Sequence, residues 1–429
     1  MKILFVYPRF QRHAEAHPEL KKWVPMNEYL GSPSLGIAAM AAVTPDDIQV
    51  EFRDDRLSPA DRATDADVVA FSFFTPAATR AIELAAYFRA QGKKTIAGGI
   101  FPTMMPELCE QHFDAVVVGE GEPIWATVLS DLKNKSLKRR YKAPEIPDIS
   151  KLPQPRVDLS LAKEAGDFKP DDYPVQLSRG CPMSCVACVL PTSMTKSLRH
   201  FSIDHVVGQL EQLNKHGKRA CLTEDTSWFP GANAKQLRLL FERIVSHGAP
   251  ATISYIGISM PLIITSTPDM LKLAKSAGVD MFYLVGGFDP ITRGAFTGKD
   301  PKNLARAYEA IKKSLDAGIE PYTSFLLGNE DDDEGTVDRM LEFAAKSGIT
   351  KAEFAIFTPY PGTPSWIRLE KEGRIIDRDW GHYNDANCVF EPKLMSAKQV
   401  TEGYLRLWRD FYAGKDFSDK CVAERTIQF

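Results

Sequence analysis

The sequence predicts an α/β fold with three parts: a doubly wound parallel sheet, a partial (β/α)6 barrel, and a small helical segment at the C-terminus. Two observations lead to this prediction. Short apolar runs alternate with stretches of helical periodicity along most of the chain, an order typical of parallel sheets covered by helices. A proline-rich connector near residue 150 separates two such series, so each series is expected to form a sheet of its own.

The first series fills residues 1–142 and is predicted to form the doubly wound sheet. Its strands are expected at residues 3–6, 48–53, 68–72, 94–97 and 115–118. Its helices are expected at residues 35–42, 76–90 and 123–132. Ligands of such sheets bind beyond the carboxyl ends of the strands. The loops at residues 72–76, 98–103 and 119–122 are therefore the candidate binding loops.

Residues 143–160 carry four prolines and are predicted to form a stiff, extended linker. Strand and helix patterns then alternate through residues 161–365 at roughly 25 to 35 residues per unit, the spacing of a parallel barrel. The strands are expected at residues 174–177, 220–223, 252–256, 281–285, 322–327 and 352–356. The last part, residues 366–429, is rich in aromatic residues and is expected to close the open side of the barrel.

The composition indicates an enzyme of the cytoplasm. The chain has 429 residues, of which 44% are hydrophobic, enough for at least two buried cores. Its 53 basic and 56 acidic residues nearly balance, which argues against nucleic acid as a partner. No apolar stretch reaches the roughly 18 residues of a membrane-spanning helix, and the N-terminus does not read as a signal peptide. Three of the seven cysteines lie in one short run, which argues against a disulfide framework.

That run is the most specific motif in the chain. Cys181, Cys185 and Cys188 are separated by three and by two residues. Three thiolates on one loop can each hold one iron of a 4Fe-4S cluster, which leaves the fourth iron open to another ligand. An open coordination position is what separates a reactive metal site from a structural one. A zinc site completed by a histidine, such as His200, or by an acid is the alternative, although no second Cys-x-x-Cys pair supports it.

The three cysteines resemble the signature of the radical S-adenosylmethionine (SAM) enzymes. The resemblance implies that SAM binds the open iron and is cleaved there to methionine and a 5'-deoxyadenosyl radical. It also implies that Glu224 and Asp225, after the second barrel strand, receive the methionine amino group. Asp289, in a Gly-Gly-Phe-Asp element, takes the place of a glutamate that contacts the ribose in relatives.

The three binding loops of the first sheet resemble those of the cobalamin-binding domain that precedes many radical SAM cores. The resemblance implies that Gly98, Gly99, Gly119 and Glu120 lie against cobalamin. No Asp-x-His-x-x-Gly string is present to supply a histidine to cobalt, so one of Phe73, Phe74 and Thr75 is expected to cover the lower face of the cobalt. Relatives often carry Gly-Gly-Pro-His-Pro-Thr where this chain has Gly-Gly-Ile-Phe-Pro-Thr. A domain that has kept its sheet and lost cobalamin is the alternative.

The resemblance implies a class B radical SAM methyltransferase that contains a 4Fe-4S cluster, SAM and cobalamin and methylates an unactivated carbon of a small metabolite or natural product. Alternatives are a cobalamin-containing cyclase, rearrangement or oxidation catalyst, and a radical SAM enzyme without cobalamin. An electron donor such as flavodoxin or ferredoxin is the expected protein partner. No catalytic side chain is assigned.

Two charged runs receive a structural interpretation. Residues 330–334 are five consecutive acids. They are predicted to open a helix, where negative charge suits the helix dipole. Residues 133–142 include six basic residues and are predicted to be an exposed helix end and loop. Neither run is assigned a function.

Overall fold

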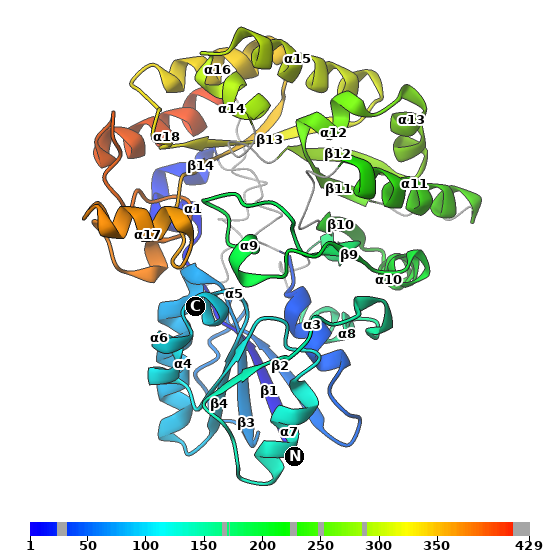
Figure 1. Ribbon diagram of the computed structural model, residues 1–429, viewed down its shortest axis with the longest axis vertical. Helices are drawn as coiled ribbons and strands as arrows, with labels where there is room; N and C mark the ends of the chain where they lie inside the picture. Colours follow the sequence, from blue (N-terminus) through cyan, green and yellow to red (C-terminus); the bar gives the residue numbers. More distant parts are fainter. Residues whose placement is uncertain are drawn as a thin grey trace.

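The computed structural model describes residues 1–23, 32–164, 170, 172–223, 230–247, 253–284 and 290–414. Two parallel sheets follow one another along the chain, as the sequence predicts. Figure 1 shows the N-terminal sheet and its helices in the lower half of the molecule, and the second sheet in the upper half. The short helix α9, Leu190–Ser193, lies between the two halves and contacts α5, Ile100–Met104, of the lower one.

The N-terminal sheet has the strand order β2-β1-β3-β4-β5-β6, and every neighbouring pair is parallel. Its strands are β1 Lys2–Tyr7, β2 Gln49–Asp54, β3 Val68–Ser72, β4 Lys94–Gly98, β5 Ala115–Val118 and β6 Arg140–Lys142. The first five confirm the prediction. The sixth corrects it, because the end of the basic run forms an edge strand and not a loop. Its Tyr141 is buried while Arg140 and Lys142 are exposed, and so short an alternation gives a weak signal.

Helices cover both faces of this sheet, which makes it doubly wound. On one face, α3 (Leu35–Ala42) and α7 (Trp125–Lys133) pack on Ile3 and Phe5 of β1. On the other face, α4 (Ala78–Ala90) and α6 (Pro106–His112) pack on the alternate residues of the same strand. Side chains that alternate between two apolar faces are what a strand buried on both sides requires.

The connector is less extended than predicted. It contains a single turn of 3-10 helix, Ile149–Lys151, and a short helix, α8 Asp158–Leu161. Asp148 caps the 3-10 turn, because its side chain accepts from the Ser150 N–H at 3.1 Å. The prolines therefore stiffen the segment without keeping it straight.

The second sheet has the order β14-β13-β12-β11-β10-β7, again with parallel neighbours throughout. Its strands are β7 Asp172–Gln176, β10 Arg219–Thr223, β11 Ile253–Ile258, β12 Val279–Leu284, β13 Glu320–Leu327 and β14 Lys351–Ile356. Six parallel strands in sequential order confirm the partial barrel. Besides α9, the helices between these strands in the described part of the chain are α10 Ile203–Lys215, α11 Pro230–Ser246, α12 Met260–Thr265, α13 Pro268–Ser276, α14 Pro290–Thr297, α15 Pro301–Asp316 and α16 Thr336–Ser347.

The acidic run directly precedes a helix, as predicted, but does not form its first turn. Helix α16 begins at Thr336, after the run, and Gly335 is its N-cap. The run forms a turn in which Asp332 is buried and accepts from the Gly328 and Asn329 N–H groups, both at 2.8 Å. Asp332 therefore stabilises the backbone at the end of β13 and not the N-terminus of α16.

The C-terminal segment contributes α17 (Pro364–Lys371) and α18 (Ala397–Phe411). Helix α18 packs on the edge strand β14 through Phe354 and Trp408, whose ring centroids lie 5.3 Å apart. The Tyr412 hydroxyl then donates to the Ala352 carbonyl oxygen at 2.5 Å and accepts from the Ala352 N–H at 3.0 Å. The tail thus covers the exposed edge of the barrel sheet. None of the described helices is long and apolar enough to cross a membrane.

Asp385, in the same segment, carries a half-buried carboxyl group on a strained backbone. Its φ is +61°, and the Tyr360 hydroxyl donates to its Oδ1 at 2.8 Å. Burial raises the pKa of this carboxyl to about 6. The folded state therefore holds a proton that the unfolded state has released, and the stability from this group falls as the pH rises from about 4 to about 6.

We expect Asp385→Asn to stabilise the protein at pH 7.5 by up to about 3 kcal/mol and to change little at pH 4. Asparagine keeps the acceptor oxygen, tolerates a positive φ and carries no charge to bury. Urea denaturation of both proteins at the two pH values measures the difference. Asp46→Asn, at an exposed site, is the control. An equal difference at both pH values would contradict the burial of an ionised carboxylate.

Candidate cofactor site

The cysteine run lies on a loop that follows the first barrel strand. Two short antiparallel strands close this loop at its base, β8 Ser178–Arg179 and β9 Arg199–His200, with Arg179 opposite Arg199. The three cysteines and α9 lie between these strands. The loop therefore stands at the carboxyl end of β7, the edge where a parallel barrel places its reactive groups.

The three thiols differ in exposure. Cys181 is buried, and its N–H donates to the Thr195 carbonyl oxygen at 3.1 Å, whereas Cys185 and Cys188 are half-buried. Burial, and after it the neighbouring Cys181, raises the pKa of the Cys185 thiol. Within the described ranges, no three His, Cys, Asp or Glu side chains are gathered as closely as the ligands of one metal ion. The role of the three cysteines as cluster ligands therefore stays a prediction from their spacing and their common loop.

The residues predicted to contact SAM fall outside the described part of the chain. Glu224 and Asp225 follow Thr223, the last residue of β10, and Asp289 stands five residues after the end of β12 at Leu284. Both strands end at the same edge of the barrel as β7. The roles of these three acids stay predictions.

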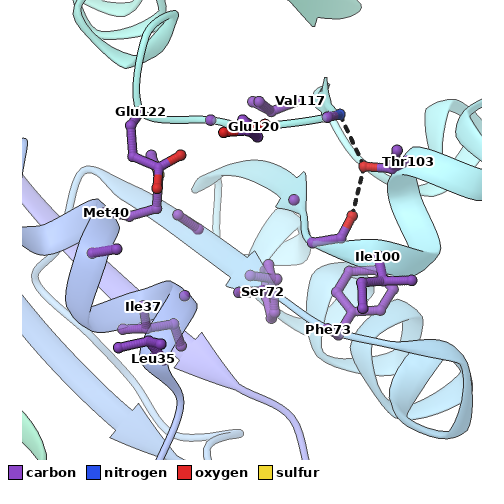
Figure 2. A pocket seen from close by; sticks show the side chains of 18 of the residues that line it. Leu35, Ile37, Met40, Ser72, Phe73, Ile100, Thr103, Val117, Glu120 and Glu122 are labelled. Carbon is purple, nitrogen blue, oxygen red and sulfur yellow. Dashed lines mark hydrogen bonds between the residues drawn. The ribbon is translucent and has the colours of Figure 1, made fainter. Parts of the chain in front are cut away.

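A cavity of about 340 Å³ opens at the carboxyl ends of the N-terminal strands. It lies where a doubly wound sheet binds its ligand, and its volume is in the range of small-molecule sites. Six of the seven residues predicted for cobalamin line it: Phe73, Phe74, Gly98, Gly99, Gly119 and Glu120. Thr75 does not, because it is buried in the turn that leads into α4. Figure 2 shows Leu35, Ile37 and Met40 of α3 on one side of the cavity, and Phe73 and Ile100 on the other.

Phe73 and Phe74 differ in burial and in packing. Phe73 is buried, and its ring centroid lies 5.9 Å from that of Phe101 and 5.7 Å from that of Phe113, in the core beneath the cavity. Phe74 is half-buried and makes an edge contact with Phe10 at 4.8 Å. Of the three side chains predicted to cover the cobalt, Phe74 is the one that remains partly exposed beside the cavity.

The glycines also differ. Gly99 has φ of +102°, and a Cβ there would lie 2.7 Å from the Phe73 carbonyl oxygen, so the packing of two loops already requires glycine. Gly119 has φ of +80°, and a Cβ there would meet nothing within 4 Å. The backbone at Gly119 is thus the one that stays open to a ligand.

Thr103 joins these two loops and was not singled out from the sequence. Its hydroxyl donates to the Gly99 carbonyl oxygen at 2.8 Å and accepts from the Gly119 N–H at 2.9 Å, as the dashed lines in Figure 2 show. The binding loops after β4 and β5 are thereby fixed to each other. A threonine in the first turn of a helix is too common to reveal such a contact from the sequence.

Glu120 has partners that the sequence did not predict. Its Oε1 accepts from Arg199 at 2.6 Å, and its Oε2 accepts from Arg199 and from Arg179, both at 3.1 Å. Both arginines belong to the base of the cysteine loop. The carboxylate therefore lines the cavity while it is bound to the second half of the molecule.

Comparisons with known proteins agree with this architecture. The family described as "B12 binding domain" matches residues 32–129, which contain all three binding loops. A family described as a domain of unknown function, DUF4070, matches residues 363–426. Bacteriochlorophyllide d C-8(2)-methyltransferase of Chlorobaculum tepidum is 28% identical over 87% of this chain and 85% of its own length. Bacteriochlorophyllide d C-12(1)-methyltransferase of the same organism is 26% identical over 95% of this chain and 91% of its own length.

Solved structures show the same fold. The radical SAM methyltransferase TsrM from Kitasatospora setae, with cobalamin and a [4Fe-4S] cluster bound, gives a TM-score of 0.63 at 16% identity and covers 94% of this chain and 85% of its own. The chain is thus similar, over nearly its whole length, to cobalamin-binding radical SAM methyltransferases. A more distant relative, the anaerobic magnesium-protoporphyrin IX monomethyl ester cyclase of Cereibacter sphaeroides, is 22% identical over 97% of this chain and 71% of its own length.

The cofactors of cobalamin-binding radical SAM enzymes fit the residues present. Beside the predicted loops, Gln176, Arg179, Ser193 and Met194 from the cysteine-loop region line the same cavity. Ser193 is 6% exposed, and its hydroxyl has no hydrogen-bond partner within the described residues. A buried hydroxyl without a partner is costly unless a ligand satisfies it. The amide side chains of a corrinoid are suitable partners, so the cavity suits a corrinoid better than a purely apolar ligand.

Proposed function

We propose that this protein is a C-methyltransferase that methylates an unactivated carbon of a small metabolite or natural product. One observation carries the proposal: the cysteine loop forms a wall of the corrinoid cavity, through Arg179, Ser193 and Met194. Methyl transfer that follows hydrogen abstraction needs both reactive centres beside one substrate, since effective reaction requires the reacting atoms to be held in place. When bound, the cluster, SAM and cobalamin supply the radical chemistry and the methyl group.

We further propose roles for individual residues. Cys181, Cys185 and Cys188 hold the cluster, and Glu224, Asp225 and Asp289 contact SAM. On the corrinoid side, the backbone at Gly98 and Gly119 lets the ligand approach, Phe74 covers the lower face of the cobalt, and Ser193 donates to the ligand. The half-buried position of Phe74 and the open space above Gly119 support these assignments.

We also propose domain boundaries at residues 142, 160 and 365. The end of β6 at Lys142 and the start of α17 at Pro364 support the outer two. A cytoplasmic location and a flavodoxin or ferredoxin as electron donor are part of the proposal, because the cluster needs reduced thiols and a supply of single electrons. The near balance of 53 basic and 56 acidic residues supports a function without nucleic acid.

The test is a product assay on protein purified without oxygen and supplied with iron, sulfide and hydroxocobalamin. With SAM, a strong reductant and a small-molecule extract, we expect S-adenosylhomocysteine and 5'-deoxyadenosine to rise together, because methyl transfer consumes one SAM for each product. SAM with a deuterated methyl group should place its label in one small molecule, found by mass spectrometry. Label in no molecule would contradict the proposal.

The second candidate is a cyclase or a related oxidation or rearrangement catalyst, which the similarity to the magnesium-protoporphyrin cyclase favours. Such an enzyme would form 5'-deoxyadenosine without an equal amount of S-adenosylhomocysteine. A radical SAM enzyme without cobalamin would do the same and would bind no hydroxocobalamin. The ratio of the two nucleoside products, read together with corrinoid content, therefore separates the three functions.

A further inference from the structure

Four largely buried charged side chains connect the corrinoid cavity to the cysteine loop. Glu120 and Glu122 lie on the loop after β5, and Arg179 and Arg199 face each other on β8 and β9. We call these four residues the charge cluster. Their side chains are between 7% and 13% exposed. The cluster has no net charge, because two carboxylates meet two guanidinium groups.

The contacts of the charge cluster are directional. Arg199 forms a two-pronged pair with the carboxylate of Glu120, through Nη1 at 3.1 Å and Nη2 at 2.6 Å. Arg179 donates from Nη1 to Glu120 at 3.1 Å and to Glu122 at 2.8 Å. Such fork-shaped pairs fix orientation as well as distance. The nearby carboxylates outweigh the cost of burial and raise the pKa of Arg179, so its charge is permanent.

The charge cluster joins three segments that are far apart in the sequence. Its acids belong to the N-terminal sheet and its arginines to the base of the loop that carries Cys181, Cys185 and Cys188. Arg199 also donates to the Pro147 carbonyl oxygen at 2.9 Å, in the connector. The charge cluster is thus one place where largely buried, geometrically defined contacts set the orientation of the cysteine loop relative to the first sheet.

The same segments form the wall of the cavity. Glu120, Glu122 and Arg179 of the charge cluster line it, and so do Ser193 and Met194 of the cysteine loop. A ligand in the cavity would therefore contact the first sheet and the cysteine loop together. The Ser193 hydroxyl, which has no hydrogen-bond partner among the residues that the structure describes, is an independent sign that the loop, and not only the sheet, contacts that ligand.

We propose that the charge cluster is a positioning device which couples the two cofactor sites, so that a corrinoid in the cavity and an iron-sulfur cluster on the loop each favour the binding of the other. The inference rests on the cofactors of the proposed function. Both cofactors would restrain the same loop. The first to bind therefore reduces the conformational entropy that the loop loses when the second one binds. Coupling of this kind is reciprocal by thermodynamic necessity.

The test is a titration of the full-length protein with hydroxocobalamin, before and after reconstitution with iron and sulfide under anaerobic conditions. We expect the dissociation constant, read from the corrinoid absorbance, to fall by about fivefold or more when the cluster is present, within the usual range of coupling between sites. In the reverse direction, hydroxocobalamin should slow the loss of iron to a chelator. Equal dissociation constants for the two forms of the wild-type protein would overturn the proposal.

Arg199→Met should abolish the difference between the two forms, because the loop loses its two-pronged contact. Arg219→Met is the matched control, since Arg219 pairs with the exposed Asp280 at the other end of the barrel strands and should leave the coupling unchanged. The double variant Glu120→Gln with Arg199→Met leaves no unpaired charge at this pair. It should therefore fold even if the single variant is destabilised by the unpaired carboxylate of Glu120. Ser193→Ala should weaken hydroxocobalamin binding and reduce the coupling without disturbing the charge cluster.

The outcome is distinguishable from that of the proposed function. Suppose that the wild type shows coupling, that Arg199→Met removes it, and that no labelled methyl product forms. This result would support the inference on the charge cluster and contradict the proposed methyltransferase. A labelled methyl product from a protein whose two forms bind hydroxocobalamin equally would do the reverse. Coupling that survives in Arg199→Met and in the double variant would overturn the role of the charge cluster.

Discussion

Replacing Cys181, Cys185 and Cys188 together with alanine is expected to abolish both 5'-deoxyadenosine formation and methyl transfer. The loss should reach the limit of detection, roughly a millionfold, because no side chain of the protein can replace a metal cofactor in this chemistry. Iron analysis and the product assay measure it. The fold should survive, since the loop contributes one buried cysteine to the structure while both sheets have cores of their own.

Cys388→Ala is the control for this experiment. Its thiol donates to the Phe390 carbonyl oxygen at 3.3 Å, and burial raises the pKa of the thiol to about 12, so the free thiol stays protonated at neutral pH. We expect this variant to keep its iron and its activity. Wild-type protein that contains zinc in place of iron, or a triple alanine variant that still cleaves SAM, would exclude the radical SAM mechanism.

The parts of the fold that local patterns encode could be predicted from the sequence. The first five strands of the N-terminal sheet and the six barrel strands are short apolar runs between turns, and each run carries its own signal. The spacing of the three cysteines is likewise local. This is why the two sheets, and the loop expected to carry the cluster, could be assigned before the structure was known.

The contacts that join the two halves could not be predicted in this way. Glu120 is separated by 59 residues from Arg179 and by 79 from Arg199, and nothing in the local pattern of either segment indicates the other. Ser193 reaches the corrinoid cavity only because α9 is placed between the halves (Figure 1). Edge strand β6 has a single buried residue, too little for a periodic signal.

Gly180→Ala is the single substitution expected to damage the cysteine loop most. Gly180 has φ of +95°, and a Cβ at this position would lie 2.3 Å from the Ser197 carbonyl oxygen and 2.9 Å from that of Thr195. Both obstacles are backbone atoms of the same loop, so neither can rotate away. The Cys181 N–H bonds to that same Thr195 oxygen, and the substitution therefore displaces the first cysteine from its anchor.

We expect Gly180→Ala to retain little iron after reconstitution and to lose SAM cleavage, while both sheets stay folded. The conformational penalty of a positive φ alone is about 1 to 2 kcal/mol, and the steric conflict adds to it. Gly217→Ala isolates the first effect, because Gly217 has φ of +66° and its added Cβ would meet nothing within 4 Å. This control should lower the melting temperature slightly and keep its iron. Equal iron content in the two variants would show that the tight closure of the loop at Gly180 is not needed to hold the cluster.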